Sequence, residues 1–248
     1  MIQGLSKPIW GKKLLKVENL SVSHGIIQAI YSVRFHIGQG ECVALLGSNG
    51  AGKTTILNAI SGVLPIMSGA VLFQGRHIEG TTASQRFAAG VIQVPEGGKI
   101  FPYMTVKENL IMGATGRDEA WAKREKTLKQ VFKLFPILSE RQNLQARLLS
   151  GGERQMFVMG RGLMAHPKIL MIDEPSLGLA PKALLEVYRM MEIFRNEGIT
   201  LLLSDQNVQQ ALQFAERAYV LENGRIALEG SSRELLKSDH IKTVYLGI

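Results

Sequence analysis

Cysteine and aromatic residues are scarce in this chain of 248 residues. Its one cysteine, Cys42, has no partner for an internal disulfide, and cysteine and histidine nowhere cluster with the spacing of a metal site. Because Cys42 lies in an apolar stretch, we expect it to be a small core residue. Hydrophobic residues make up 46% of the chain but aromatic residues only 6%. This composition predicts one substantial, mainly aliphatic core, or such a core plus a subdomain.

Long hydrophobic runs are also missing. No stretch reaches the roughly 18 to 20 apolar residues of a membrane-spanning helix. Met1–Lys13 contains no apolar run of signal-peptide length. We therefore expect a cytosolic protein whose membrane association, if it has one, comes through a partner.

Positive charge is in excess, with a formal net charge of +8, but it forms no long run. The densest segments are Lys7–Lys16 and Lys123–Lys133. Scattered positive charge argues against a dedicated nucleic-acid groove. It is compatible with an acidic nucleotide or anionic lipid as a partner, and equally with an ordinary solvated surface.

A glycine-rich stretch with the spacing G-x-x-x-x-G-K-T is the strongest signal in the sequence. This phosphate loop comprises Gly47, Ser48, Asn49, Gly50, Ala51, Gly52, Lys53 and Thr54. Its glycines let backbone N–H groups turn toward an anion, Lys53 can reach the outer phosphates, and the Thr54 hydroxyl can bind Mg²⁺. The flanking stretches Glu41–Leu46 and Thr55–Ile60 predict a strand and a helix. That context favours a nucleotide site over a plain glycine-rich turn.

Two carboxylates end an apolar stretch about 120 residues further along the chain. Ile169–Ile172 is typical of a strand buried on both faces of a parallel sheet, and Asp173 and Glu174 follow it. Ligands of α/β folds bind at the C-terminal ends of such strands. Asp173 suits Mg²⁺, and Glu174 suits a residue that orients or deprotonates the attacking water. The alternative, two polar residues that simply end a strand, is weaker because the phosphate loop lies upstream.

Leu149–Glu153, with the sequence L-S-G-G-E, is a second candidate anion site, here named the signature stretch. Ser150 and Glu153 have the spacing of a capping box, and Glu153–Met164 predicts a helix. The two glycines after Ser150 are not needed for a cap and weaken a first helical turn. A serine and two glycines at a helix N-terminus instead favour a phosphate-binding surface.

The remaining pattern predicts an α/β core interrupted by helices. Leu14–Ser23 and Ile26–Ile37 alternate in polarity, as antiparallel strands with one wet face do, and residues 1–13 have the composition of a flexible tail. Residues from about 83 to 166 favour helices, expected over 105–112 and 117–135, with Trp121 on the buried face of the second and Pro136 ending it. Strands are also expected at Ala70–Phe73, Gly90–Val94 and Ile199–Leu203, with a hairpin around Asn223-Gly224. Helices are expected at Pro181–Asn196, Val208–Phe214, Ser232–Lys237 and Ile241–Leu246.

The three motifs together resemble the ATP-binding subunits of ABC transporters, whose signature L-S-G-G-Q differs from the signature stretch in its last residue. The resemblance runs from about Leu14 to the C-terminus. It implies an α/β fold with a P-loop NTPase core of mostly parallel sheet and flanking helices, an antiparallel β subdomain, and a helical signature subdomain at about 83–166. It also implies that residues 14–248 form one ABC-type ATPase domain.

Several positions depart from the family pattern. Glu96 stands where a Q-loop glutamine is usual and is assigned to the metal site, although Gln93 is a second claimant. Gln206 takes the place of the H-loop histidine, and Ala180 that of the D-loop aspartate. His24 stands where an aromatic residue usually stacks on adenine, and its planar ring can stack with less surface.

At these positions the sequence is similar to one branch of the family, the second ATPase subunit of branched-chain amino-acid importers. V-P-E-G at Val94–Gly97, E-P-S-L-G-L-A-P at Glu174–Pro181 and the terminal Tyr245-Leu246-Gly247 support this assignment. Relatives in the branch serve urea or short amides, which is the alternative substrate class. Two rival functions are an ABC ATPase acting on nucleic acid and a P-loop kinase. The chain lacks the long coiled coil or second ATPase cassette of the first, and the signature stretch has no role in the second.

The resemblance implies two ATPase domains facing head to tail, with each ATP between the phosphate loop of one and the signature stretch of the other. ATP and Mg²⁺ are the implied cofactors. The implied nucleotide contacts are His24, Gly47, Ser48, Asn49, Gly50, Ala51, Gly52, Lys53, Thr54 and Thr55, and, toward the partner's γ-phosphate, Ser150, Gly151, Gly152 and Glu153. The implied metal contacts are Thr54, Asp173 and Glu96, and the implied catalytic residues are Glu174 and Gln206.

The resemblance also implies the partners and the location. These are a second ATPase subunit, expected to be non-identical although an isolated homodimer is an alternative, two transmembrane permease subunits and, indirectly, an extracytoplasmic solute-binding protein. Nucleic acid is not among the expected partners. The expected place is the cytoplasmic side of the inner (plasma) membrane, where the membrane subunits hold the chain peripherally. The loop Glu96–Met104, with Phe101 and Tyr103 exposed, is the expected contact with them.

Overall fold

A computed structural model describes residues 12–246 of the chain. The predicted N-terminal tail at 1–13 falls almost entirely outside these residues, as does Gly247 of the C-terminal motif. Lys13, which we placed in the tail, begins the first strand. Within the described part, no helix combines the length and the apolar character that a membrane crossing requires.

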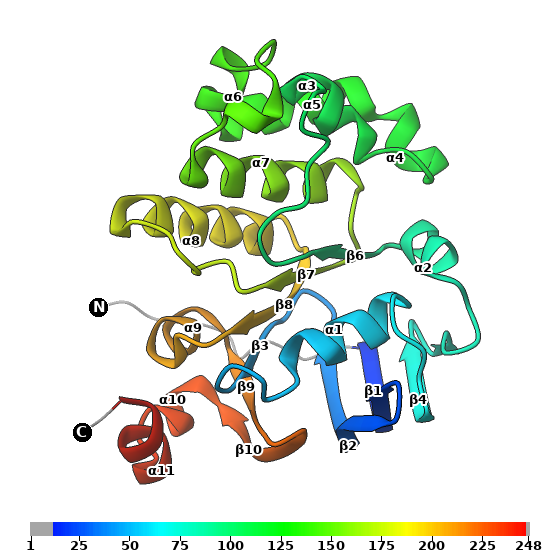
Figure 1. Cartoon of the computed structure of the whole chain (residues 1–248), viewed down its shortest axis with the longest axis vertical. Coiled ribbons are helices and arrows are strands. Elements are labelled where there is room, and N and C mark those ends of the chain that lie inside the picture. The colour runs from blue at the N-terminus through cyan, green and yellow to red at the C-terminus, as the bar shows by residue number, and fades with distance from the viewer. Residues whose placement is uncertain (1–11, 247–248) are drawn as a thin grey trace.

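A six-stranded sheet forms the centre of the molecule, in the order β10-β9-β3-β8-β7-β6 (Figure 1). All neighbouring pairs are parallel except β9 and β10, which form an antiparallel hairpin at one edge. The strands are β3 (Cys42–Leu46), β6 (Val91–Val94), β7 (Ile169–Asp173), β8 (Thr200–Asp205), β9 (Arg217–Glu222) and β10 (Arg225–Ser231). β3 and β7 are buried along their whole length, as expected of strands covered on both faces.

A second, antiparallel sheet of four strands packs beside the first, in the order β2-β1-β4-β5. Its strands are β1 (Lys13–His24), β2 (Ile27–Gly38), β4 (Ser68–Phe73) and β5 (Arg76–His77). The predicted antiparallel pair is therefore present. The short strand β5, which begins at Arg76, was not among the expected elements.

The helices divide into two groups. α1 (Lys53–Ser61), α2 (Ala83–Ala89), α8 (Pro181–Asn196) and α9 (Val208–Phe214) flank the sheets, and α10 (Ser232–Leu235), α11 (Asp239–Ile241) and the π-helical turn η2 (Lys242–Leu246) end the described chain. The other group forms a layer at the top of Figure 1. It consists of α3 (Val106–Met112), α4 (Asp118–Ala122), α5 (Arg124–Leu134), α6 (Pro136–Glu140), the short 3-10 helix η1 (Ala146–Leu148) and α7 (Gly151–Met164).

The helix predicted over residues 117–135 is wrong as a single element. The chain breaks at Lys123, which lies outside the helical region of backbone conformation and separates α4 from α5. Trp121 is consequently not on a buried face but is 44% exposed, with the Arg124 guanidinium 4.3 Å from its ring centroid. Pro136 ends α5 but also begins α6, because proline is tolerated in the first turn of a helix.

Alternate side chains of the central strand β3 point into two different hydrophobic clusters, one on each face of the sheet. Cys42, Ala44 and Leu46 join the cluster that includes the upper helical layer, and Val43 and Leu45 join the one under the antiparallel sheet. Burial raises the pKa of the Cys42 thiol well above its ordinary value. The prediction that Cys42 is a small core residue is confirmed.

The β9–β10 hairpin packs against the phosphate loop. Asn223 and Gly224 both have positive φ angles, 48° and 73°, as the predicted Asn-Gly turn requires. The backbone N–H of Gly224 donates a hydrogen bond of 3.0 Å to the carbonyl oxygen of Ala51. A Cβ atom at Gly47 would overlap the carbonyl oxygen of Leu221 in the same hairpin. The first glycine of the motif is therefore needed for close packing against β9.

Candidate functional site

The phosphate loop joins the C-terminal end of β3 to the N-terminus of α1, which is the arrangement that the sequence predicts. Gly50 and Gly52 have left-handed φ angles of 80° and 109°, and Gly52 is the residue just before the first turn of α1. A non-glycine side chain is strained in this conformation. The glycines thus let the backbone curl so that the free N–H groups of the helix start can face an anion.

Lys53 lies folded back against the loop. Its Nζ donates hydrogen bonds of 2.8 Å to the carbonyl oxygen of Gly47 and 3.1 Å to that of Ser48. It also forms an ion pair with the Oε1 of Glu174, at 2.9 Å. Both side chains of this pair are almost completely buried, at 5% and 6% exposure. The two residues that the sequence assigned to the phosphate and to the attacking water therefore contact each other directly.

Asp173 ends β7 next to the phosphate loop. Its Oδ1 accepts a hydrogen bond of 3.1 Å from the Thr54 hydroxyl and another from the Ser204 hydroxyl. Its Oδ2 is buried and has no hydrogen-bond partner among residues 12–246. An unpartnered buried carboxylate oxygen beside a hydroxyl suits a hard cation such as Mg²⁺ or its water ligands. The donor set thus fits the metal expected from the sequence.

Glu174 adopts a left-handed backbone conformation, with φ 48°. Its N–H donates a hydrogen bond of 2.9 Å to the carbonyl oxygen of Ser204, and its Oε2 accepts one of 3.3 Å from the N–H of Gln206. Backbone strain of this kind costs roughly 1 to 3 kcal/mol and persists where the surroundings impose it. Here the neighbouring strand β8 imposes it from the side.

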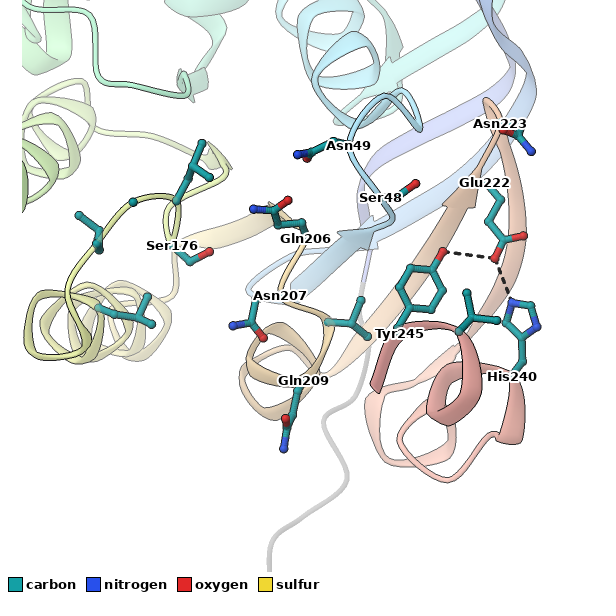
Figure 2. A pocket seen from close by; sticks show the side chains of 16 residues that line it. Ser48, Asn49, Ser176, Gln206, Asn207, Gln209, Glu222, Asn223, His240 and Tyr245 are labelled. Atoms are coloured by element: carbon teal, nitrogen blue, oxygen red, sulfur yellow. Dashed lines mark hydrogen bonds and ion pairs between the residues drawn. The ribbon is translucent and has the colours of Figure 1, made fainter. Parts of the chain in front are cut away.

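Gln206 donates its backbone N–H to the Glu174 carboxylate. Its side chain is exposed and points into a large cavity of about 940 Å³, where Ser48, Asn49 and Ser176 lie nearby (Figure 2). The structure therefore places the Gln206 side chain in the same cavity as Ser48 and Asn49 of the phosphate loop.

A cavity of about 460 Å³ lies directly over the phosphate loop. The residues that line it are His24, Ala29, Asn49, Gly50, Gly52, Lys53, Thr54, Thr55, Glu96, Glu174 and Leu177. His24 lies at its edge, with Nε2 3.0 Å from the hydroxyl oxygen of Thr55. Nine of the predicted nucleotide, metal and catalytic residues thus line one cavity.

Glu96 and Gln93, the two candidates for the Q-loop position, have different contacts in the structure. Gln93 lies within β6 and donates a hydrogen bond of 2.9 Å from Nε2 to the Oδ1 of Asn58 in α1. Glu96 follows the end of the strand, is exposed, and lines the cavity over the phosphate loop. Gln93 is hydrogen-bonded to α1 but also lines a second cavity with Thr54 and Asp173. Glu96 lines that cavity as well as the one over the phosphate loop.

The signature stretch forms the capped start of α7. The Ser150 hydroxyl accepts a hydrogen bond of 3.3 Å from the N–H of Glu153, and a Glu153 carboxylate oxygen accepts one of 2.8 Å from the N–H of Ser150. This reciprocal pair is the predicted capping box. A Cβ at Gly152 would lie 3.0 Å from that of Ala183, but one at Gly151 would meet nothing within 4 Å. None of these residues lines the cavity over the phosphate loop.

Two functional-site neighbours were missed by the sequence reasoning. Ser204 and Asp205 end β8, and Ser204 bonds Asp173 while Asp205 bonds residues on both sides of the site. The available signal was a second apolar strand, Ile199–Leu203, ending in polar residues. Its position beside β7, where Asp173 pairs with Ser204 in parallel register, could not be read from the chain order.

The loop Glu96–Met104 projects two aromatic side chains into solvent, Phe101 at 48% and Tyr103 at 76% exposure. Beside it lies a mainly apolar groove of about 390 Å³ between α2, α3 and α7. The groove is lined by Phe87, Ile92, Gln93, Val94, Pro95, Lys99, Ile100, Phe101, Met112, Gly113, Thr115, Val158, Arg161, Gly162 and Ala165. The exposure of the two aromatic residues matches the prediction for this loop.

Comparison with known proteins gives consistent matches along the chain. The family model described as ABC transporter matches residues 30–177. The high-affinity branched-chain amino acid transport ATP-binding protein BraG of Pseudomonas aeruginosa is 41% identical over 236 residues, covering 94% of this chain and 100% of BraG. The lipopolysaccharide export system ATP-binding protein LptB of Escherichia coli is 32% identical over 234 residues, covering 94% and 97%. The crystal structure of a nucleotide-free ATP-binding cassette from an ABC transporter superposes with a TM-score of 0.80 at 28% identity, covering 95% and 99%.

Proposed function

This chain belongs to the ABC transporter family of ATP-binding subunits, and from that premise we propose that it energises the import of branched-chain or related amino acids. It is an ABC-type ATPase. The observation that supports the amino-acid assignment is the 41% identity over nearly the whole chain to a relative named for branched-chain amino-acid transport. LptB is named for export and is 32% identical, so the direction of transport and the solute are parts of the proposal.

The proposed nucleotide chemistry starts from the Lys53–Glu174 ion pair. When ATP occupies the phosphate loop, its γ-phosphate competes with the Glu174 carboxylate for the Lys53 Nζ, because both are anions at the same cation. Glu174 is thereby released toward the attacking water, which it orients or deprotonates. Thr54, Asp173 and Glu96 are the residues that would hold Mg²⁺. The metal, when bound, neutralises charge on the β- and γ-phosphates.

The signature stretch is proposed to bind the γ-phosphate of an ATP held by a second ATPase subunit. Gly151 supports this role, because neither a positive φ angle nor a neighbouring atom within residues 12–246 requires glycine there. A glycine at an exposed helix start allows an anion to approach the backbone N–H groups closely. We propose a non-identical partner subunit in the assembled transporter.

The exposed loop Glu96–Met104 and the apolar groove beside it are the proposed contact with the transmembrane subunits. Replacing Phe101 and Tyr103 together by serine is expected to abolish co-purification of those subunits in mild detergent, since two large apolar contacts are lost. Thermal stability of the isolated chain should change little, because both side chains are exposed. Met67→Ser, at 57% exposure directly before β4 of the antiparallel sheet, is the matched control and should retain the partners.

The same purified complex tests the proposed function. Reconstituted in vesicles with its solute-binding protein, it should accumulate leucine, isoleucine or valine in an ATP-dependent manner. Uptake of urea or a short amide instead would favour the alternative substrate class. Salt-sensitive binding of DNA or RNA, without any co-purifying membrane subunit, would contradict the transporter assignment.

The two ATP sites of the transporter are proposed to hydrolyse unequally. Gln206 cannot change its protonation state as a histidine can, and Ala180 offers no carboxylate. Glu174→Gln in this subunit alone should therefore reduce ATP hydrolysis less than the matching change in the partner, with a difference of roughly tenfold. Steady-state ATPase rates of the two reconstituted single-site variants measure this. Equal losses would contradict the inequality.

A further inference from the structure

Asp205 is a fully buried carboxylate at the C-terminal end of β8, and no step of the proposed chemistry uses it. Its Oδ1 accepts two hydrogen bonds of 2.8 Å, from the Ser176 hydroxyl and from the N–H of Asn207. Its Oδ2 accepts a hydrogen bond of 3.3 Å from the Tyr188 hydroxyl. Burying a carboxylate is costly unless its oxygens are satisfied in this way.

The three donors come from three different segments around Glu174. Ser176 belongs to the loop 175–180 that follows Glu174, Tyr188 to α8, and Asn207 to the turn that leads from β8 into α9. The N–H of the intervening residue, Gln206, donates to the Glu174 carboxylate. Figure 2 shows Ser176 on one wall of the large open cavity and Gln206 and Asn207 beside it. The Asp205 side chain therefore joins the loop after Glu174 to the 206–207 turn, whose backbone contacts the Glu174 carboxylate.

We propose that Asp205 is a positioning residue for ATP hydrolysis, which ties loop 175–180 to the 206–207 turn and so fixes the placement of the Glu174 carboxylate. The inference rests on the proposed role of Glu174. Loop 175–180 and Gln206 share the open cavity with Ser48 and Asn49 of the phosphate loop. A second ATPase subunit that closes over this face would press on loop 175–180, and Asp205 would carry that displacement to the backbone at Gln206.

Two features of the network indicate that Asp205 positions the neighbouring segments and does not only stabilise the fold. Burial raises the pKa of both Asp205 and Tyr188, so the tyrosine remains a neutral donor and the desolvated carboxylate is expensive to keep. A buried carboxylate is weak as a stabilising element compared with an apolar packing residue. Its value lies in directional bonds to segments that must keep a fixed spacing.

The main test is Asp205→Asn in the reconstituted transporter, with ATP hydrolysis measured against ATP concentration. Asparagine keeps the size but presents an NH₂ group in place of one acceptor oxygen. The expected result is a kcat lowered roughly tenfold to hundredfold, as misplacement of a catalytic group gives, with KM for ATP unchanged within about twofold, because binding depends on the phosphate loop. An unchanged kcat would overturn the inference.

Glu41→Gln is a matched control. Glu41 is also a buried carboxylate, 1% exposed, and accepts from the Gly38 N–H at 2.6 Å and from Arg217. It precedes β3 and therefore lies at the opposite end of the central sheet from the phosphate loop. Glu41→Gln should lower the melting temperature and leave kcat unchanged. A comparable loss of kcat in Glu41→Gln would mean that Asp205 acts only through general stability.

Ser176→Ala provides a second route if Asp205→Asn does not fold. It removes the loop side of the link and should lower kcat as well. Where Asp205→Asn does fold, the double variant Ser176→Ala/Asp205→Asn should be no worse than Asp205→Asn alone. Independent, multiplying effects would overturn the link. Glu174→Gln, assayed in parallel, separates the two levels of the argument. If Glu174→Gln hydrolyses ATP normally, the proposed role of Glu174 is wrong, and so is the inference about Asp205. If Glu174→Gln is inactive while Asp205→Asn is normal, only the inference about Asp205 is wrong.

Discussion

Lys53→Ala is expected to abolish ATP binding by this chain. Lys53 is the cation of the phosphate loop, and its Nζ lies 2.9 Å from a buried carboxylate that the γ-phosphate would replace. A charge-assisted hydrogen bond contributes about 1.5 to 3 kcal/mol. Loss of two such bonds to the β- and γ-phosphates corresponds to a weakening of at least roughly 100-fold. Titration with a fluorescent ATP analogue, or calorimetry, measures the change.

The same substitution also damages the fold, and the two effects need to be separated. Removing Lys53 leaves Glu174 buried without its partner, and breaking a buried ion pair from one side costs roughly 3 to 5 kcal/mol. The double variant Lys53→Ala/Glu174→Gln removes both charges and should recover most of the lost thermal stability. ATP binding should remain absent in it. Recovery of binding together with stability would show that Lys53 supports the fold and not the phosphates.

The sequence was sufficient to predict the elements that carry a local signal. The phosphate loop, the capping box at Ser150 and the Asn-Gly hairpin each have residue types at a fixed spacing that have few alternative explanations. The structure has each of them where expected. It also brings the phosphate loop, Asp173 and Glu174 together, as proximity at the carboxyl ends of parallel strands requires.

Features that depend on the order of strands could not be predicted. β8 lies between β3 and β7 although about 150 residues separate it from β3 in the chain, and this order places Ser204 on Asp173 and Asp205 beside the loop after Glu174. The break at Lys123 is of the same kind, because helical periodicity continues across it and only tertiary packing decides where the helix bends. The features that the sequence did not predict thus depend on nonlocal packing, and those that it did predict depend on local sequence patterns.

Ser150→Arg is expected to leave ATP binding intact while blocking ATP-driven association and transport. Ser150 is exposed, begins α7, and is absent from the lining of the cavity over its own phosphate loop. Binding by the isolated chain should therefore be unchanged within about twofold, since no phosphate-loop contact is touched. A long cationic side chain at the helix start would occupy the space that the partner's γ-phosphate needs, and a shared site could not close.

Loss of the helix cap is the competing explanation, and the chain contains a control for it. Ser231 caps α10 with the same capping box, toward Glu234. Ser231→Arg and Ser150→Arg should each cost about 1 kcal/mol of stability through the lost cap, but only Ser150→Arg should prevent the ATP-dependent dimer of a Glu174→Gln background in size-exclusion chromatography. Ser150→Ala, which lacks the cap and adds no bulk, should retain partial association. Normal dimerisation and transport by Ser150→Arg would eliminate the shared-site arrangement, because that arrangement needs direct contact between the partner's phosphate and the start of α7.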